Sequence, residues 1–230
     1  MSPAERHDTA ETRERILEAA ERLFADKGYA ATSVREITTE SGTNVAAVDY
    51  HFGGKDKLYL ETFRSLLREV RDRRIVAMQR DMTEKPEMDL EGFMTSFADA
   101  FMEPLVDRSR GRLFLGFFAH EMSEPHLPPL VFVEEFIRPL AEISTQGLDR
   151  FGPPMDSVTQ SMCIMSVVGQ LMHAIKAQQR FAHHDQPAMV PSDLSEHIRH
   201  IVRFSVAGIR ACARCDSCEG LVEPPKEAAS

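Results

Sequence analysis

The feature that most constrains the fold is a helical repeat that glycines interrupt early in the chain. Apolar residues recur every three or four positions along nearly all 230 residues, and the alternating pattern typical of strands is almost absent. Glycine commonly ends a helix because it adopts the left-handed conformation without steric cost. Glycines therefore predict three short helices, over about 12–27, 33–41 and 44–52.

The second and third of these helices have the features of a helix-turn-helix. Ser33 and Glu36 have capping-box spacing, with Thr32 as an alternative N-cap, and Gly42 supplies the turn. The third helix is expected to anchor itself through the apolar residues Val45, Val48 and Phe52. Its other side is small or polar and suits entry into a DNA major groove, with candidates Thr43, Asn44, Ala46, Ala47 and His51.

Residues 12–63 resemble the N-terminal domain of the TetR/AcrR family of transcription regulators. The similar segments are ILEAAERLFADKGY, TSVREI, the Ser41–Gly42 turn and YHFGGKDKL, in that order. The resemblance implies a homodimer whose two recognition helices enter successive major grooves of a palindromic operator. It also implies a C-terminal helical domain that binds a small effector; there the similarity extends only to helix number and length.

The resemblance further implies which residues contact DNA. Ser33 or Thr32 would cap the second helix at a phosphate, Tyr50, His51 and Lys55 would hold the backbone, and Asn44, Ala46 and Ala47 would approach bases. Asp49 departs from the family, which often has an aromatic residue there. It either accepts a hydrogen bond from a cytosine or is solvated or internally paired. The predicted DNA-binding residues are Thr32, Ser33, Thr43, Asn44, Ala46, Ala47, Asp49, Tyr50, His51 and Lys55.

Six further helices are predicted, which makes the fold all-α with about nine helices. They lie near 56–80, 89–108, 111–122, 128–150, 155–181 and 192–214. We expect a helix-turn-helix domain over 1–58, a ligand-binding and dimerisation domain over 59–215, and a disordered tail over 216–230. The 56–80 helix has an apolar stripe, and its arginines are interpreted as a solvated face. The stripe comprises Tyr59, Phe63, Leu66, Val70 and Ala77.

Phenylalanine and methionine are abundant in the C-terminal helices, which fits either a plain bundle core or an adaptable ligand cavity. The last two helices have continuous apolar faces and are the predicted dimer interface. Candidate ligand-lining residues are Phe97, Phe101, Phe117, His120, Met165, Gln170, Met172 and His173.

Charge and cysteine content constrain the functional class. Residues 1–80 carry 14 Lys and Arg against 14 Asp and Glu, so the net charge of −9 lies in the remainder; this permits DNA binding without arguing for it. The sequence shows no export signal, no apolar run of about 20 residues, and no catalytic or cofactor motif. We therefore expect a cytoplasmic protein, without a membrane partner, cofactor or enzymatic activity.

Cys212, Cys215 and Cys218 form a C-x2-C-x2-C run. They are either incidental thiols or a metal or redox site. The leading hypothesis is a DNA-binding repressor released by a small, largely apolar effector. The alternative is a redox- or metal-sensing regulator on the same scaffold.

Overall fold

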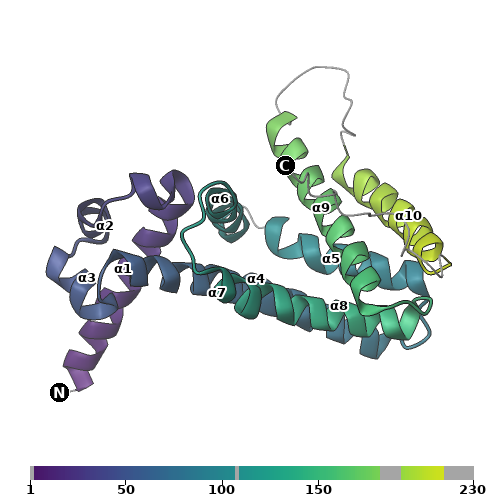
Figure 1. The fold of residues 1–230 in the computed structure, drawn as a ribbon. Coiled ribbons are helices and arrows are strands. Elements are labelled where there is room, and N and C mark those ends of the chain that lie inside the picture. Colours follow the sequence, from purple (N-terminus) through teal and green to yellow (C-terminus); the bar gives the residue numbers. More distant parts are fainter. Residues whose placement is uncertain (1–2, 107–108, 182–192, 215–230) are drawn as a thin grey trace, which may run out of the picture. The chain divides into compact units, whose positions relative to one another are not determined.

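The computed structural model describes residues 3–106, 109–181 and 193–214, and within them every regular element is helical (Figure 1). The α7, η1 and α8 segments form one unbroken stretch, so the nine predicted helices and the all-α class are confirmed. The elements are α1 (Pro3–Ala31), α2 (Val34–Ser41), α3 (Val45–Phe52), α4 (Lys55–Glu84), α5 (Leu90–Val106), α6 (Arg110–Ser123), α7 (Pro129–Phe132), η1 (Val133–Ile137), α8 (Arg138–Phe151), α9 (Ser157–Phe181) and α10 (Leu194–Cys212).

The chain packs as two units. Unit 1 comprises residues up to 79 together with 99–140, and unit 2 comprises 80–98 together with the residues after 140. This division follows packing. The functional boundary at residue 58 stays a prediction, and the expected tail over 216–230 lies outside the described residues.

The head, which we define as α1–α3, is set by its caps. Ser33 accepts a hydrogen bond from the backbone of Glu36, whose side chain accepts one from the backbone of Ser33, so the capping box is complete. Gly42 follows α2 in the left-handed region at φ 65°, as the tight turn requires. Asn44 then caps α3 through the backbone N–H of Ala47 at 2.9 Å.

Helix α6 lies directly against α1 in unit 1. A side chain at Gly116 would overlap the backbone carbonyl of Ala25, so the two helices approach each other as closely as backbones allow. Arg110, at the start of α6, pairs with Glu21 on α1 and with Glu69 on α4. Three helices are therefore joined by one guanidinium group.

Aromatic rings from α4, α6 and the α7–η1 segment fill the middle of unit 1. Phe63 lies 5.9 Å from both Phe117 and Phe132 by ring centroids, and Phe136 lies 6.0 Å from Phe114. Phe136 is buried and belongs to the π-helical turn η1. π-Helical turns inside longer helices occur frequently at functional sites.

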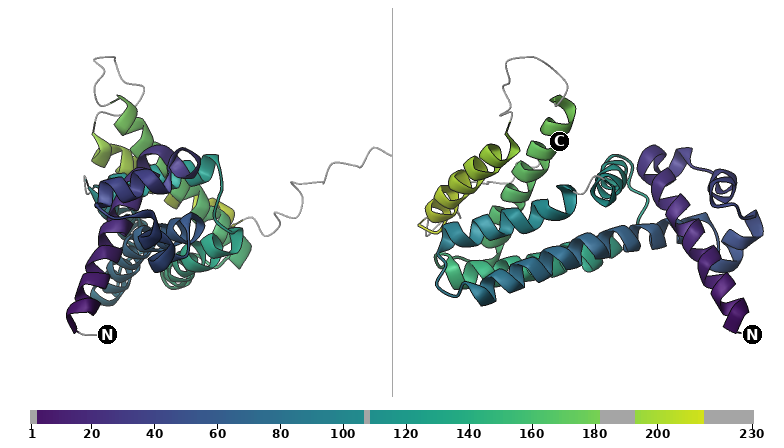
Figure 2. Two further views of the ribbon diagram at one scale, coloured as in Figure 1. Left: turned by 90° about the vertical axis from the view of Figure 1, so that its left-hand side faces the viewer. Right: turned by 180° about the vertical axis from the view of Figure 1, so that it is seen from behind.

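Unit 2 is built around α8, α9, α10 and the beginning of α5. Helices α9 and α10 pack side by side, as the green and yellow-green ribbons show in both views of Figure 2. Residues Ser157–Gln178 of α9 are long and apolar enough to cross a membrane by length and composition, with 44% of that stretch buried. The core helix of a soluble protein passes the same test, and Ile164, Val167 and Leu171 are buried in this way.

Candidate DNA-binding site

Helix α3 presents an exposed surface that a buried anchor holds in place. Val48 and Phe52 are buried against α1 and α2, whereas Asn44, Ala46 and Asp49 are exposed. Ala47 is half-buried. The N-cap uses the Asn44 carbonyl oxygen, which leaves the amide nitrogen to donate outward.

Val45 is placed differently from our expectation. Its side chain is 51% exposed, so it does not anchor α3 with Val48 and Phe52. Val45 is the first residue of the helix, and the buried residues Val48 and Phe52 lie further along it. It joins the exposed surface, where its methyl groups can contact a thymine methyl. The sequence signal for this was its position directly after the N-cap.

Tyr50 and His51 lie near the end of α3. Tyr50 is 74% exposed and its ring packs edge-on to the half-buried His51 ring at 5.0 Å. The Asp49 carboxylate is exposed, and no ion pair joins it to another described residue. Of the roles considered for Asp49, internal pairing therefore has no support among the residues described.

The structure separates the two candidate caps of α2. Ser33 is the N-cap, while Thr32 is buried and donates its hydroxyl to the carbonyls of Gly28 at 2.8 Å and Leu23 at 3.2 Å. Thr43 is half-buried and shares a hydrogen bond with Ser41 at 2.8 Å. Ser33 is exposed and can reach a phosphate without losing a packing contact.

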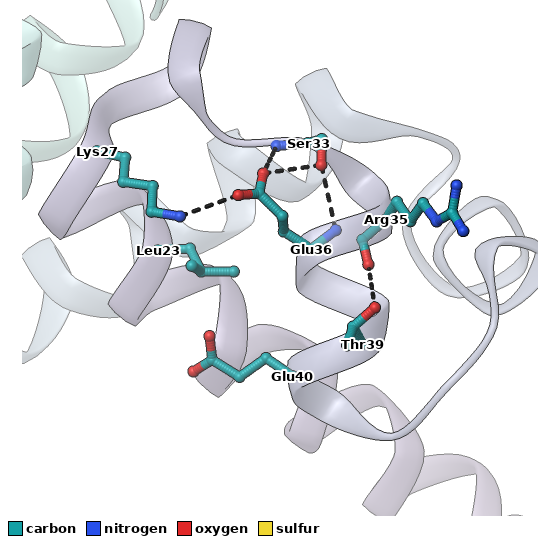
Figure 3. Close-up of a pocket in the computed structure, with 7 residues that line it drawn as sticks. All are labelled: Leu23, Lys27, Ser33, Arg35, Glu36, Thr39 and Glu40. Carbon is teal, nitrogen blue, oxygen red and sulfur yellow. Dashed lines mark hydrogen bonds and ion pairs between the residues drawn. The ribbon is translucent and has the colours of Figure 1, made fainter.

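The surface beside α2 is hollowed and carries mixed charge (Figure 3). Lys27 donates to Glu36 at 2.9 Å, and this bond together with the hydrogen bonds from Ser33 lowers the pKa of Glu36 to about 2. The Arg35 guanidinium points away from this pair, and no ion pair joins it to a described residue. Arg35 is thus a cation available to DNA that our sequence reasoning missed.

Lys55 lies at the first turn of α4 but folds back onto α1. Its ammonium donates to the Tyr29 carbonyl at 2.7 Å and lies 3.9 Å from the centre of the Tyr29 ring. Burial lowers the pKa of Lys55. The Tyr29 hydroxyl donates to Asp56, which raises the pKa of Tyr29 to about 12. To reach a phosphate, the Lys55 ammonium must rotate away from Tyr29.

A buried carboxylate connects α6 to this region. Glu121 is 4% exposed and accepts hydrogen bonds from the Tyr59 hydroxyl and from the backbone N–H groups of His126 and Leu127, each at 2.9 Å. His126 in turn packs on the Tyr29 ring at 3.7 Å. The end of α6 is thereby tied to both α4 and the last turn of α1.

The candidate ligand-lining residues fall into separate environments. Phe101 and Phe117 are buried in unit 1 and Phe97 in unit 2. His120 lies against α1, with its ring nitrogen 3.2 Å from the Asp26 carbonyl oxygen. On α9, Met165 and His173 are exposed, and Gln170 and Met172 are half-buried. The structure therefore does not bring the predicted set together around one interior space.

Arg68 on α4 is exposed as expected, but Arg64, Arg71 and Arg74 do not belong to a solvated face. Arg64 donates to Glu135 at 2.8–3.1 Å, and Arg71 donates to the Glu135 carbonyl oxygen at 2.8 Å. Arg74 is only 2% exposed. The expectation failed because distant segments cover these positions, which local sequence cannot show: η1 contacts Arg64 and Arg71, and Phe101 and Phe114 contact Arg74.

Of the cysteine run, only Cys212 is described; Cys215 and Cys218 lie outside the described residues. Cys212 on α10 is exposed and neighbours Cys163 on α9, and burial raises the pKa of Cys163 to about 11. A raised pKa keeps a thiol protonated and slows its oxidation. Within residues 3–106, 109–181 and 193–214, no three metal-ligating side chains gather.

Comparison with known proteins gives two matches to family models. "Bacterial regulatory proteins, tetR family" matches residues 16–62, and "HTH-type transcriptional dual regulator CecR, C-terminal domain" matches residues 90–209. The second match alone covers more than half of the 230 residues.

Individual relatives and solved structures point to the same family. The HTH-type transcriptional repressor AcnR of Corynebacterium efficiens is 35% identical over 91 residues, which are 38% of this chain and 48% of that protein. The chain thus matches about half the length of such curated relatives. A TetR family regulator from Marinobacter aquaeolei has a TM-score of 0.66 at 18% identity, covering 89% of this chain and 98% of that one. The multidrug binding protein EbrR, complexed with imidazole, has a TM-score of 0.54 at 23% identity, covering 84% and 93%. The chain therefore belongs to the TetR family of bacterial transcription regulators and is a DNA-binding regulator rather than an enzyme.

Proposed function

We propose that the protein is a cytoplasmic, homodimeric repressor that binds an inverted-repeat operator. It releases the operator when a small effector binds the body, by which we mean the helices from α4 onward. One observation carries the proposal: α3 holds a row of exposed small and polar side chains on a buried anchor, with a cap at each end. Such a helix is a rigid probe for a major groove. Repression follows AcnR, which is named a repressor, although the matching CecR model is named a dual regulator.

Contacts to DNA divide by chemistry. Asn44, Val45, Ala46 and Ala47 face base edges, and Asp49 accepts from a cytosine amino group. Ser33, Arg35 and Tyr50 are placed for phosphates, with His51 and Lys55 reaching them after side-chain rotation. Thr32 is left out, because its hydroxyl is buried and already bonded twice to α1.

A second copy of the chain would cover the outer face of α9 and α10. Val158, Met162 and Met165 recur at helical spacing on α9, and the two methionines are 55% and 57% exposed. Phe204 lies exposed on α10. Gly169 and Gly208 are exposed with open space beside them, which allows close approach of a partner helix. Met165 and His173 thus serve association rather than ligand binding.

Selection of bound sequences from random duplex DNA tests the proposal. We expect enrichment of an inverted repeat whose half-sites lie one helical turn apart, roughly 34–36 Å. Met162→Asp should yield a monomer in sedimentation velocity and lose the repeat. Met122→Asp, an equally exposed methionine on α6, is the matched control and should stay dimeric. Enrichment of single half-sites, or dimers of the Met162 variant, would contradict the proposal.

Effector release is tested separately. EbrR is named a multidrug binding protein, which supports an apolar ligand in the helical body here. We expect an effector to change the position of α4 and with it the separation of the two α3 helices, because α4 follows the head directly in the chain. The measurement is fluorescence anisotropy of the selected duplex during titration with candidate ligands.

A further inference from the structure

Arg74 differs from every other arginine that α4 contributes to unit 1. Arg64 and Arg68 pair with Glu135, Arg71 with Asp72, and Arg73 with Glu103. Among the residues that the structure describes, Arg74 forms no ion pair, although it is the most deeply buried of the five. A buried charge without a counter-charge is costly, so its retention calls for a reason.

Among the described residues, the Arg74 guanidinium hydrogen-bonds to a single acceptor. Its Nε and Nη2 atoms donate to one acceptor, the Phe101 carbonyl oxygen, at 3.3 and 3.0 Å. The charge also lies 3.8 Å from the centre of the Phe101 ring and 5.8 Å from that of Phe114. A guanidinium has five N–H donors, so one carbonyl uses a minority of them. Burial lowers the pKa of Arg74, but an arginine in a protein stays charged at neutral pH.

The apolar side chains around Arg74 belong to elements that can adjust. Val70 and Met78, one turn to either side on α4, are buried on the same face, and methionine repacks readily. Phe114 contacts Phe136, which is in the π-helical turn η1. A positive charge at the edge of an aromatic cluster that extends through Phe114 to an irregular helical turn is the composition of a ligand site with one orienting polar group.

We propose that Arg74 is the anchor of the effector site and that the effector is an apolar organic anion. Its carboxylate or sulfonate would bind the guanidinium as a two-point ion pair, and its apolar body would displace or pack among Phe101, Phe114 and Phe136. The identity of this ligand as the effector rests on the proposed function. The binding site itself does not, because the contacts that define it lie within unit 1.

Two fluorescent probes that differ by one charged group test the site on the full-length protein. Anilinonaphthalene sulfonate carries the anion, and phenylnaphthylamine is the same aromatic body without it. Arg74→Met keeps the apolar volume and removes the charge, which is a well-tolerated exchange for a buried ion. We expect the sulfonate to bind the variant at least ~10-fold more weakly, and phenylnaphthylamine to bind both proteins alike.

The matched control is Arg68→Met, a change to an exposed arginine of the same helix, which should leave both affinities unchanged. On the unaltered protein, phenylbutyrate should displace the sulfonate probe while its methyl ester should not. This second measurement decides the question even if Arg74→Met fails to fold. Equal binding of the sulfonate to both proteins, equal loss of both probes, or equal competition by acid and ester would overturn the proposal.

The test of the Arg74 site and the test of operator binding can give independent results. Operator binding without any probe should be the same for Arg74→Met and the unaltered protein, since Arg74 lies on the body portion of α4. If no inverted repeat is selected but the charge-dependent probe binding is found, the site stands and the regulatory role fails. If the repeat is bound and the probe pair shows no charge dependence, the reverse holds.

Discussion

Unit 1 contains two kinds of candidate site, an exposed one on α3 and a buried one between α4, α6 and η1. On α3, the candidate base contacts are small side chains that are exposed or half-buried, and caps at Asn44 and Gly53 fix the backbone beneath them. Between α4, α6 and the η1 turn, the notable groups are charged and buried: Glu121 with three hydrogen bonds and Arg74 with one carbonyl partner. The exposed site needs a rigid frame, whereas the buried one draws its strength from the exclusion of water.

Substitutions in the two regions should therefore have different effects. A change on the α3 surface should alter DNA binding and leave folding intact. Removal of the buried Glu121 carboxylate should alter folding first, because three donors lose their acceptor in a dry interior. Each prediction below tests one side of this contrast.

Ala46→Glu should have the largest effect on function. An added carboxylate on the groove-facing side of α3 should weaken operator binding about 100-fold or more, through repulsion by phosphates and loss of base contact. The unfolding temperature should not fall, because a negative charge in the first turn of a helix interacts favourably with the helix dipole. Thr95→Glu, at an exposed position of α5, is the control for added charge. A fall in stability that parallels the loss of binding would break the contrast.

Glu121→Ala should have the largest effect on stability. It leaves the Tyr59 hydroxyl and the N–H groups of His126 and Leu127 without their acceptor in a buried site. We expect a loss of about 3 kcal/mol in the free energy of unfolding, measured by urea denaturation. Glu124→Ala, at an exposed site three residues on, should change it by less than about 0.5 kcal/mol. Equal results for the two variants would show that burial is not the cause.

Lys55→Ala and Arg35→Ala compare a partly buried cation with an exposed one. Each should weaken operator binding about 10-fold and reduce the slope of log affinity against log salt by about one unit, the value for one phosphate contact. Lys85→Ala, at the residue that follows α4 in unit 2, should leave the slope unchanged. If the slope changes for Arg35 and not for Lys55, the Lys55 ammonium stays on the Tyr29 carbonyl in the complex.

Glu36→Gln should have the smallest effect, which is a change in how the melting temperature depends on pH. Lys27 and Ser33 lower the pKa of Glu36 to about 2, below the value of about 4.5 expected in the unfolded chain. The carboxylate therefore stabilises the head above the unfolded value, and this contribution disappears as pH falls towards 2. The variant should melt below the unaltered protein at pH 7 and converge with it in acid. Glu14→Gln, on the exposed side of α1, should show no such convergence.

The sequence predicted the helices well because local chemistry specifies their ends. The Ser33 cap, the Gly42 turn and the Gly53 stop act within a few residues of their own positions, so they can be read without knowledge of the fold. The helix 44–52 was placed to within one residue. The break at residue 28 was also predicted: Gly28 has a non-helical backbone with a positive φ of 76°, so α1 is kinked there and a short helical piece follows to Ala31.

What the sequence did not show depends on packing between distant segments. The arginines of α4 acquire their partners from residues up to 71 positions away. Arg74 did leave a trace, because the apolar stripe of α4 runs through Phe63 and Val70, and the next position on that face is an arginine. The π-helical turn η1 left none that was read, since a segment of five residues is too short to show a shift in the apolar pattern.

The backbone contact between Gly116 and Ala25 has a mechanical consequence. Two helices that meet through side chains can slide, because rotamers absorb small displacements. At Gly116 and Ala25 no side chains separate helices α6 and α1. Arg110, in the first turn of α6, also forms an ion pair with Glu21 on α1. We therefore expect a displacement of α6 to move α1 with it, since little slack separates the two backbones at this point.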